Sequence, residues 1–231
     1  ARREAEAEAG HGFDLARGPL LRVKLFTLSE SAHLLSLVIH HIVSDGWSMG
    51  ILQRELSALY ESIRRGEPAA LPDLPVQYAD FAVWQRRWLS GETLDRQLGY
   101  WTEALRDPPE ALELPADRPR PAIPSHRGAR RSFALSPELG RGLRALAQRE
   151  GVTLFMLLLA AYDVLLHRYS GQRDFNVGSP VANRSAAATE GLVGFFVNTL
   201  VLRARPSADQ PFRALLAAVK EACLGAYAHQ D

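Results

Sequence analysis

Two adjacent histidines, His40 and His41, stand a short distance before Asp45 and Gly46. An imidazole can accept a proton in catalysis or bind a metal ion, and an aspartate at a helix start caps the helix or pairs with a buried cation. Because successive side chains of a strand point to opposite faces, adjacent histidines at a strand end cannot easily bind one metal ion together. We therefore expect one histidine to face a cleft and the other to face the interior.

The same cluster also has a purely structural interpretation, in which both histidines pack and Asp45 caps a helix. Most histidine pairs belong to that class, since strongly perturbed groups at functional sites are the minority. Gly46 leaves a similar choice, because a glycine either lets a ligand approach the backbone closely or simply permits a turn. Residue types and spacing leave both interpretations open.

The elements that must position this cluster follow from the apolar pattern. The stretch 33–43 is rich in branched apolar residues, which is typical of a strand buried on both faces, and the stretch 20–28 is predicted to pair with it as a hairpin. A helix is expected to begin at Ser48 and to end before Gly66. Further helices are predicted at 1–9, 76–89, 94–105, from Ser136 and Pro137 onward, at 153–169 and at 211–228, and further strands at 131–135, 174–179 and 195–204.

Composition excludes several function classes. The 27 basic and 26 acidic residues leave a net charge of +1, which gives no reason to expect a nucleic acid as partner. Cys223 is the single cysteine, so the chain has no intramolecular disulfide framework and no multi-cysteine metal site; we expect a small buried residue there. No apolar run reaches the length of a membrane span and no signal peptide is recognisable, so we expect a cytoplasmic protein without a membrane partner.

Several segments resemble those of a known family. HHIVSDGWS (40–48), FDLARGPLLRV (13–23), YADFAVWQRRWL (78–89), VGSPVANR (177–184), GFFVNTLVL (194–202) and the terminal HQD occur in the order seen in condensation domains of nonribosomal peptide synthetases. That family is related in fold to chloramphenicol acetyltransferase. The resemblance covers nearly the whole chain.

The resemblance implies an α/β fold made of two chloramphenicol acetyltransferase-like lobes, each a mixed sheet packed with helices. It identifies residues 1–115 as the C-terminal part of the first lobe and residues 131–231 as the N-terminal part of the second. The proline-rich stretch 116–130 then links the lobes. Both lobes are expected to be incomplete, so we expect the 231 residues alone to be poorly soluble and inactive.

The resemblance also implies peptide bond formation between two substrates tethered to carrier domains. The acceptor aminoacyl amine attacks the donor acyl or peptidyl thioester, and both substrates are carried on phosphopantetheine arms of upstream and downstream peptidyl carrier domains. An adenylation domain is expected in the same assembly line, and no metal or cofactor is expected in the domain itself. The histidine motif together with YADFAVWQ is most similar to the type that joins an L-donor to an L-acceptor.

Within the motif, the resemblance gives His41 the active role in the cleft, whereas His40 packs inward. A free α-amine titrates near 8, so deprotonating it at pH 7 costs only about 1.4 kcal/mol, and the imidazole has to accept a proton or orient the amine rather than supply all the basicity. The backbone N–H near Gly46 is a candidate donor to the developing oxyanion. Asp45 is expected to be structural and to pair with Arg184.

Four further residues are candidates for supporting the site from its surroundings: Trp47, Ser48, Asn183 and Asn198. Two other functions remain open beside the condensation enzyme. One is a coenzyme-A-dependent acyltransferase of related fold, although its histidine motif lies near the C-terminus, whereas here 185 residues follow Gly46. The other is a non-catalytic module that only docks carrier proteins.

Overall fold

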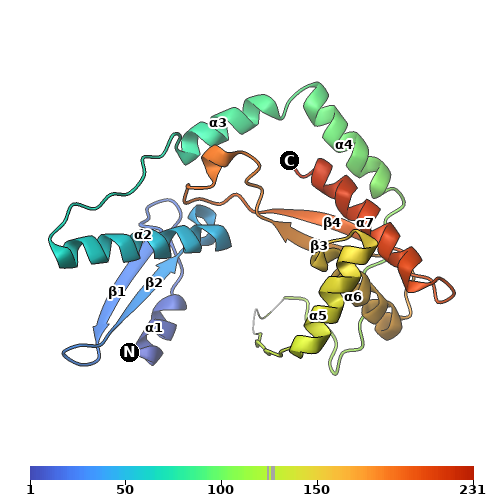
Figure 1. The fold of residues 1–231 in the computed structure, drawn as a ribbon, viewed down its shortest axis with the longest axis horizontal. Coiled ribbons are helices and arrows are strands. Elements are labelled where there is room, and N and C mark those ends of the chain that lie inside the picture. Colours follow the sequence, from blue (N-terminus) through green and yellow to red (C-terminus); the bar gives the residue numbers. More distant parts are fainter. Residues whose placement is uncertain (124, 126–127) are drawn as a thin grey trace. The chain divides into compact units, whose positions relative to one another are not determined.

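The computed structural model describes residues 1–123, 125 and 128–231, whose helices and strands gather in two units (Figure 1). The first unit contains residues 1–90 and 181–198, and the second contains residues 91–180 and 199–231. The predicted linker 116–130 falls within the second unit, and its residues 124, 126 and 127 lie outside the described residues. The lobe limits predicted along the sequence remain a prediction.

The first unit begins with helix α1 (Arg2–Ala9) and a hairpin of strands β1 (Leu21–Thr27) and β2 (His33–Ile39). The two strands pair antiparallel, with Leu21 opposite Ile39 and Thr27 opposite His33, so the predicted hairpin is confirmed. The expected burial on both faces is wrong: the side chains of β2 are exposed or half-buried. Among the described residues the sheet has only these two strands, so few atoms cover its faces.

Strand β2 also ends earlier than predicted, at Ile39 rather than at residue 43. Residues His41–Val43 form a short 3₁₀ turn instead, because Val43 N–H bonds to the carbonyl of His40 and Ser44 N–H to that of His41. Helix α2 (Gly46–Arg65) follows directly. The turn therefore separates the two histidines, since one precedes it and the other begins it.

Helix α2 has a defined start and end. Its N-cap is Asp45, whose side chain accepts the N–H of Ser48, and its C-cap is Gly66 in the left-handed conformation at φ 69°. The predicted start at Ser48 is two residues late. Helix α3 (Tyr78–Trp88) is held at its start by Asp80, which accepts the N–H of Gln77 at 2.8 Å.

The second unit holds helices α4 (Glu92–Ala104), α5 (Pro137–Glu150), α6 (Leu154–Ser170) and α7 (Phe212–Ala228). Strands β3 (Phe175–Val181) and β4 (Asn198–Ala204) are neighbours in a second two-stranded sheet. Helices α6 and α7 lie side by side and α5 lies beside α6, as Figure 1 shows. The core of this unit is apolar and includes Leu157, Leu166, Phe175, Leu216 and Cys223. Cys223 is a free, buried cysteine, as expected.

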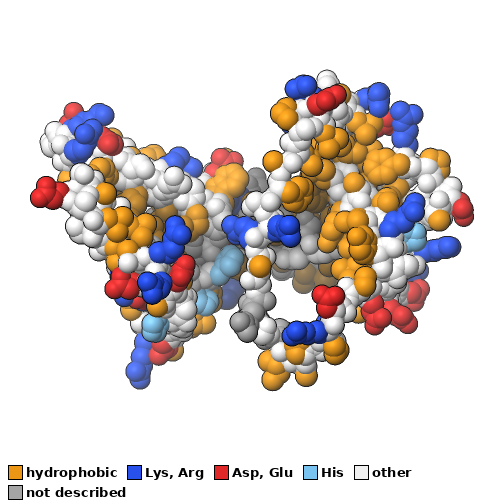
Figure 2. Space-filling model, turned by 90° about the horizontal axis from the view of Figure 1, so that it is seen from below, with side chains coloured by type: hydrophobic (Ala, Val, Ile, Leu, Met, Phe, Trp, Pro, Cys, Tyr) orange, Lys and Arg blue, Asp and Glu red, His pale blue; other side chains and the backbone are white. Residues whose placement is uncertain are grey.

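The short strand predicted at 131–135 does not form. Its apolar residues stay exposed, with Phe133 86% accessible, because no neighbouring strand among the described residues pairs with the segment. Strand β4 also begins at Asn198 rather than at residue 195. Hydrophobic side chains reach the surface of both units (Figure 2), including Val23 and Leu25 of the hairpin.

In the part of the chain that the structure describes, no helix by itself has the length and apolarity needed to cross a membrane. Helices α5 and α6 taken together pass by length and composition, but they are bent by 103° where they join.

Candidate active site at the start of helix α2

His41 begins the 3₁₀ turn that leads into helix α2, and its side chain is exposed. Its ring meets the ring of Phe195 edge to face, with centroids 5.2 Å apart and planes at 90°. The imidazole lines an open pocket of about 290 Å³ whose other walls are Leu37, Ile39, Ser44, Asp45, Gly46 and Met49. An imidazole in this position can reach a molecule that enters the pocket.

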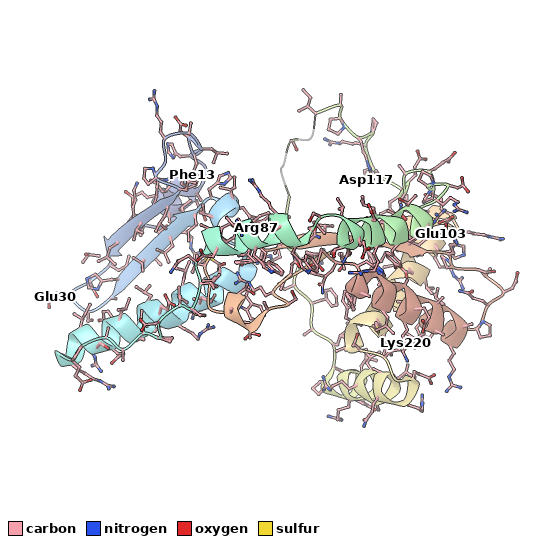
Figure 3. All side chains as sticks on the ribbon, turned by 90° about the horizontal axis from the view of Figure 1, so that it is seen from above. Phe13, Glu30, Arg87, Glu103, Asp117 and Lys220 are labelled. Atoms are coloured by element: carbon pink, nitrogen blue, oxygen red, sulfur yellow. The ribbon has the colours of Figure 1, made fainter. Side chains whose placement is uncertain are left out.

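His40 has different surroundings and is half-buried. Its Nδ1 accepts the backbone N–H of Ile42 at 3.0 Å, so that nitrogen carries no proton. The ring also packs edge to face against Phe13, a residue labelled in Figure 3, with centroids 5.7 Å apart. The two neighbouring histidines therefore contact different parts of the chain, one local backbone and the other an open pocket.

Asp45 anchors the start of helix α2 and is 3% exposed. Its Oδ1 accepts both the N–H and the hydroxyl of Ser48, at 2.8 and 2.7 Å. Its Oδ2 accepts the N–H of Phe196 at 3.1 Å. This carboxylate thus joins the helix start to a segment that lies 151 residues further along the chain.

Arg184 forms a buried ion pair with Asp45 across 139 residues of sequence. Its NH2 lies 3.2 and 3.3 Å from the two carboxylate oxygens, and the side chains of the arginine and aspartate are 2% and 0% exposed. The other terminal nitrogen donates to the carbonyls of Thr189 and Leu192, and the guanidinium lies 4.0 Å from the centre of the Phe196 ring. The structure therefore places in contact the two residues paired from the sequence.

Several groups act on the pKa of Asp45 in opposite directions. Burial by itself raises this pKa, but hydrogen bonds from Ser48 and Phe196 and the positive charge of Arg184 hold it below its usual value. Asp45 consequently stays ionised near neutral pH with all its charge used in structural contacts. A role for Asp45 as the proton acceptor does not fit this environment.

Gly46 is the first residue of helix α2. Among the described residues its N–H has no hydrogen-bond acceptor, as is usual for the first turn of a helix. A Cβ placed here would meet no described atom within 4 Å. The glycine is therefore not required by crowding within the described chain, and its N–H is a free donor at the positive end of the helix dipole.

Trp47 and Ser48 contact the returning segment 181–198. Trp47 is 47% exposed and its ring N–H donates to the carbonyl of Glu190 at 2.9 Å. Ser48 is fully buried, and its Oγ accepts the N–H of Gly194 at 3.1 Å and lies 2.9 Å from the carbonyl of that residue. Both side chains hold the segment against the helix start.

The two candidate asparagines lie on either side of this returning segment. Asn183 precedes Arg184 and has a left-handed backbone at φ 50°, a conformation that asparagine tolerates better than most residues. Asn198 is the first residue of strand β4. Their predicted role in the surroundings of the site remains a prediction.

Two site residues were not singled out from the sequence. Phe195 touches His41, and Tyr78 donates its hydroxyl hydrogen to the Phe195 carbonyl at 2.7 Å. Both lie in segments that the sequence marks only as strand and helix. The signal that could have drawn attention to them is Gly194 beside two phenylalanines, because a glycine between apolar residues often marks a close approach.

The described residues include no cluster of three or more His, Cys, Asp or Glu side chains that could hold a metal ion. The arrangement offers an accessible imidazole and a free backbone N–H at a helix start, beside a fixed, fully paired carboxylate. That combination suits the transfer of a proton next to a developing negative charge.

Comparison with known proteins identifies relatives over the whole sequence. The Condensation domain family model matches residues 1–231. A linear gramicidin synthase protein of Brevibacillus parabrevis is 54% identical over 235 residues, which is 99% of this chain and 5% of that protein. Phosphinothricin tripeptide synthetase PhsC of Streptomyces viridochromogenes is 50% identical over 219 residues, which is 95% of this chain and 20% of that protein.

Two solved structures show the same fold. The X-domain from teicoplanin biosynthesis has a TM-score of 0.88 and 32% identity, with 99% of this chain and 52% of that chain covered. The first condensation domain of the CDA synthetase has a TM-score of 0.78 and 28% identity, with 99% and 51% covered. This chain thus spans about half the length of these solved chains and a small part of the curated relatives. With its chloramphenicol acetyltransferase-like α/β fold and a family match over all its residues, the chain belongs to the condensation domain family of nonribosomal peptide synthetases.

Proposed function

We propose that this chain, within the complete protein that carries it, catalyses amide bond formation between two carrier-bound substrates. The donor is an acyl or peptidyl thioester and the acceptor is an aminoacyl amine. The observation that carries the proposal is the accessible imidazole of His41 beside the free helix start of α2, in a chain that matches the condensation family over its full length. The amino acids joined are not specified by any contact described above.

The reaction step uses His41 as a proton acceptor or as an orienting group for the amine. The acceptor nitrogen attacks the thioester carbonyl carbon, so a C–N bond forms and the C–S bond breaks. The imidazole accepts the proton that the nitrogen loses, and the departing sulfur takes up a proton to leave as a thiol. Such proton transfer contributes roughly 10²- to 10⁴-fold in rate.

Gly46 is proposed to stabilise the oxyanion that develops on the carbonyl during this step. Its N–H has no acceptor among the described residues and lies at the positive end of helix α2. Asp45 and Arg184 are proposed to be structural, because their charges are buried and spent on each other and on nearby backbone. Their contribution is to fix the helix start that presents both Gly46 and His41.

The partners follow from the proposed reaction. Both substrates arrive on phosphopantetheine arms of peptidyl carrier domains, one upstream and one downstream, and an adenylation domain belongs to the same assembly line. The arms are part of the substrates, and the proposal needs no cofactor or metal held by this chain. We also propose a cytoplasmic location, the lobe limits given above, an L-donor and L-acceptor type, and no turnover by the 231 residues alone.

The test is His41→Ala in the complete protein, with donor and acceptor loaded on their carrier domains and product measured by mass spectrometry. We expect a loss of amide formation of roughly 10²- to 10⁴-fold, with folding retained because the ring is exposed. His33→Ala is the matched control, since His33 is an exposed histidine at the start of strand β2, away from the pocket around His41. Retention of activity in His41→Ala would remove the basis of the proposal.

The same assay separates the two alternative functions. A coenzyme-A-dependent acyltransferase would form product from an acyl-coenzyme A donor without any donor carrier domain. A non-catalytic docking module would bind loaded carrier domains but give no product with wild type. We expect neither result, because the relatives named above are peptide synthetases and His41, Asp45 and Gly46 are all present.

A further inference from the structure

We propose that Tyr78 is a positioning residue that sets the orientation of the His41 ring through Phe195. The inference rests on the proposed function in one respect, namely that His41 is the reacting imidazole. It concerns residues of the first unit only. Neither Tyr78 nor Phe195 reaches the pocket wall formed by the motif itself, so their role is distinct from that of the groups already assigned.

The first step is that the His41 ring lacks a hydrogen-bonded orienting partner. Among the described residues, no side chain or backbone group hydrogen-bonds to its ring, whereas a carboxylate or carbonyl often plays that part in catalytic histidines. The ring contact that it does make is with Phe195, edge to face at 5.2 Å. Such aromatic pairs have a preferred geometry, so the phenylalanine limits the angles that the imidazole can adopt.

The second step is that the backbone around Phe195 is held at three consecutive residues. Gly194 N–H donates to Ser48 Oγ at 3.1 Å, the Phe195 carbonyl accepts from Tyr78 at 2.7 Å, and Phe196 N–H donates to Asp45 at 3.1 Å. Two of these bonds come from the start of helix α2, which directly follows His41. The third comes from helix α3 and is the contribution of Tyr78.

The third step is that Tyr78 is itself fixed. A Cβ at Gly194 would lie 2.3 Å from Cδ2 and 2.6 Å from Cε2 of Tyr78, so the tyrosine ring rests directly on the glycine backbone. The ring also packs edge to face on Phe196, with centroids 5.0 Å apart. Burial raises the pKa of Tyr78, and the negative charge of Asp45 adds to this effect, so the hydroxyl stays protonated and available as a donor.

These contacts form one connected path from helix α3 to the reacting ring. Removing the Tyr78 hydroxyl frees the Phe195 carbonyl while leaving both aromatic contacts of Tyr78 in place. A displacement of about 1 Å in a reacting group can lower a rate by about 10²-fold, and a partial loosening lowers it less. The effect belongs to kcat, because substrate binding does not involve the hydroxyl.

The experiment compares four variants in the complete protein. Tyr78→Phe removes only the hydroxyl, Phe195→Leu removes the aromatic contact, and Phe195→Tyr keeps it. The control is Tyr60→Phe, because Tyr60 is 65% exposed on helix α2 and makes no contact with His41 or Phe195. For each variant, kcat and KM for amide formation are measured together with the midpoint of thermal unfolding.

We expect kcat to fall about 3- to 10-fold in Tyr78→Phe and about 10- to 100-fold in Phe195→Leu, with KM unchanged. Phe195→Tyr should recover most of the activity lost in Phe195→Leu. A second readout is the rate at which diethyl pyrocarbonate modifies His41, measured by peptide mass spectrometry relative to His33 in the same digest. This rate should rise in Phe195→Leu, where the ring loses its covering neighbour, and it does not depend on turnover.

Equal kcat in Tyr78→Phe and Tyr60→Phe, with unchanged modification of His41, would overturn the proposal. So would a kcat in Phe195→Tyr as low as in Phe195→Leu, since a positioning contact is restored by any similar ring. The proposed function fails separately, through activity in His41→Ala. In that event the modification rates would still decide whether Phe195 and Tyr78 orient the ring.

Discussion

Two buried aspartates, Asp45 in the first unit and Asp163 in the second, place the same carboxyl group in opposite surroundings. They are 3% and 2% exposed, so water reaches neither. Contacts hold the pKa of Asp45 below its usual value, whereas burial raises the pKa of Asp163 to about 7. Equal burial therefore gives opposite shifts, and the partners decide the sign.

The difference lies in what each carboxylate meets. Asp45 accepts hydrogen bonds from Ser48 and Phe196 and faces Arg184. Asp163 lies on helix α6 in an apolar core, and its Oδ1 has no hydrogen-bond partner among the described residues. Burial raises the pKa of neighbouring Cys223 to about 11, and a negative charge on Asp163 adds to that shift.

This comparison separates two ways of tolerating a carboxyl group in the interior. The first unit keeps the charge and surrounds it with donors, which fixes the geometry of the site. The second unit favours the neutral form, which costs stability as pH rises. A buried aspartate is therefore a guide to the site only when its partners are known.

The largest effect is expected from Asp163→Asn, which removes the titrating group from the second unit. Because the folded-state pKa of about 7 is above the unfolded value near 4, the folded state binds the proton more tightly. Stability from this group is complete at low pH and is lost as pH rises through about 7, by about 4 kcal/mol in all. Urea unfolding at pH 5 and pH 8 should show the variant gaining on wild type at the higher pH.

A matching pH dependence in Asp163→Asn and wild type would contradict that expectation and erase the contrast with Asp45. Asp45 itself has the opposite sign, since its lowered pKa stabilises the folded state above the usual pKa of an aspartate and the gain is lost as pH falls through the folded value.

The second prediction breaks the ion pair of the first unit. Asp45→Ala should destabilise the protein by about 3 kcal/mol or more, because it leaves Arg184 buried and unpaired. Arg184→Ala and the double variant complete a cycle measured by urea unfolding. If the two single effects simply add, the residues are not coupled and the pair does not organise the site.

A smaller effect is expected at the histidine that packs. His40→Ala should lower the free energy of unfolding by about 1 kcal/mol, because the ring is half-buried, accepts the N–H of Ile42 and contacts Phe13. His41→Ala, at an exposed ring, serves as the control for stability. Greater destabilisation in His41→Ala than in His40→Ala would show that the two rings have been given the wrong roles.

The smallest effect on stability is expected at the helix start. Gly46→Ala should change the free energy of unfolding by less than about 0.5 kcal/mol, since a Cβ meets no described atom within 4 Å. Amide formation is measured on the same variant. A large loss of activity with unchanged stability would show that the substrate itself needs the space at Gly46, whereas a large loss of stability would contradict the open geometry.

Much of the fold was predictable because the relevant signals are local. The hairpin, the helix that ends at Gly66 and the helix that opens at Ser136 are set by apolar pattern and capping residues, and each forms. The predicted strand at 131–135 fails because a strand needs a partner, and local pattern does not report one.

The site was predictable in part. Asp45 and Arg184 were paired through family segments, since nothing in local chemistry links residues 139 positions apart. Tyr78 and Phe195 were missed because their contacts depend on how the returning segment folds back onto helix α2. Asp163 carried a usable signal: it follows Met156 and Ala160 at helical spacing, so it shares their buried face.

The long separation between Asp45 and Arg184 also orders events during synthesis of the chain. A ribosome adds about 5 to 20 residues per second, so the arginine emerges on the order of ten seconds after the aspartate. During that interval the whole stretch 91–180, which belongs to the other unit, is made first. The nascent first unit therefore waits with an uncompensated carboxylate and an unfinished aromatic cluster, and a chaperone that shields this half-built surface would act before residue 184 leaves the exit tunnel.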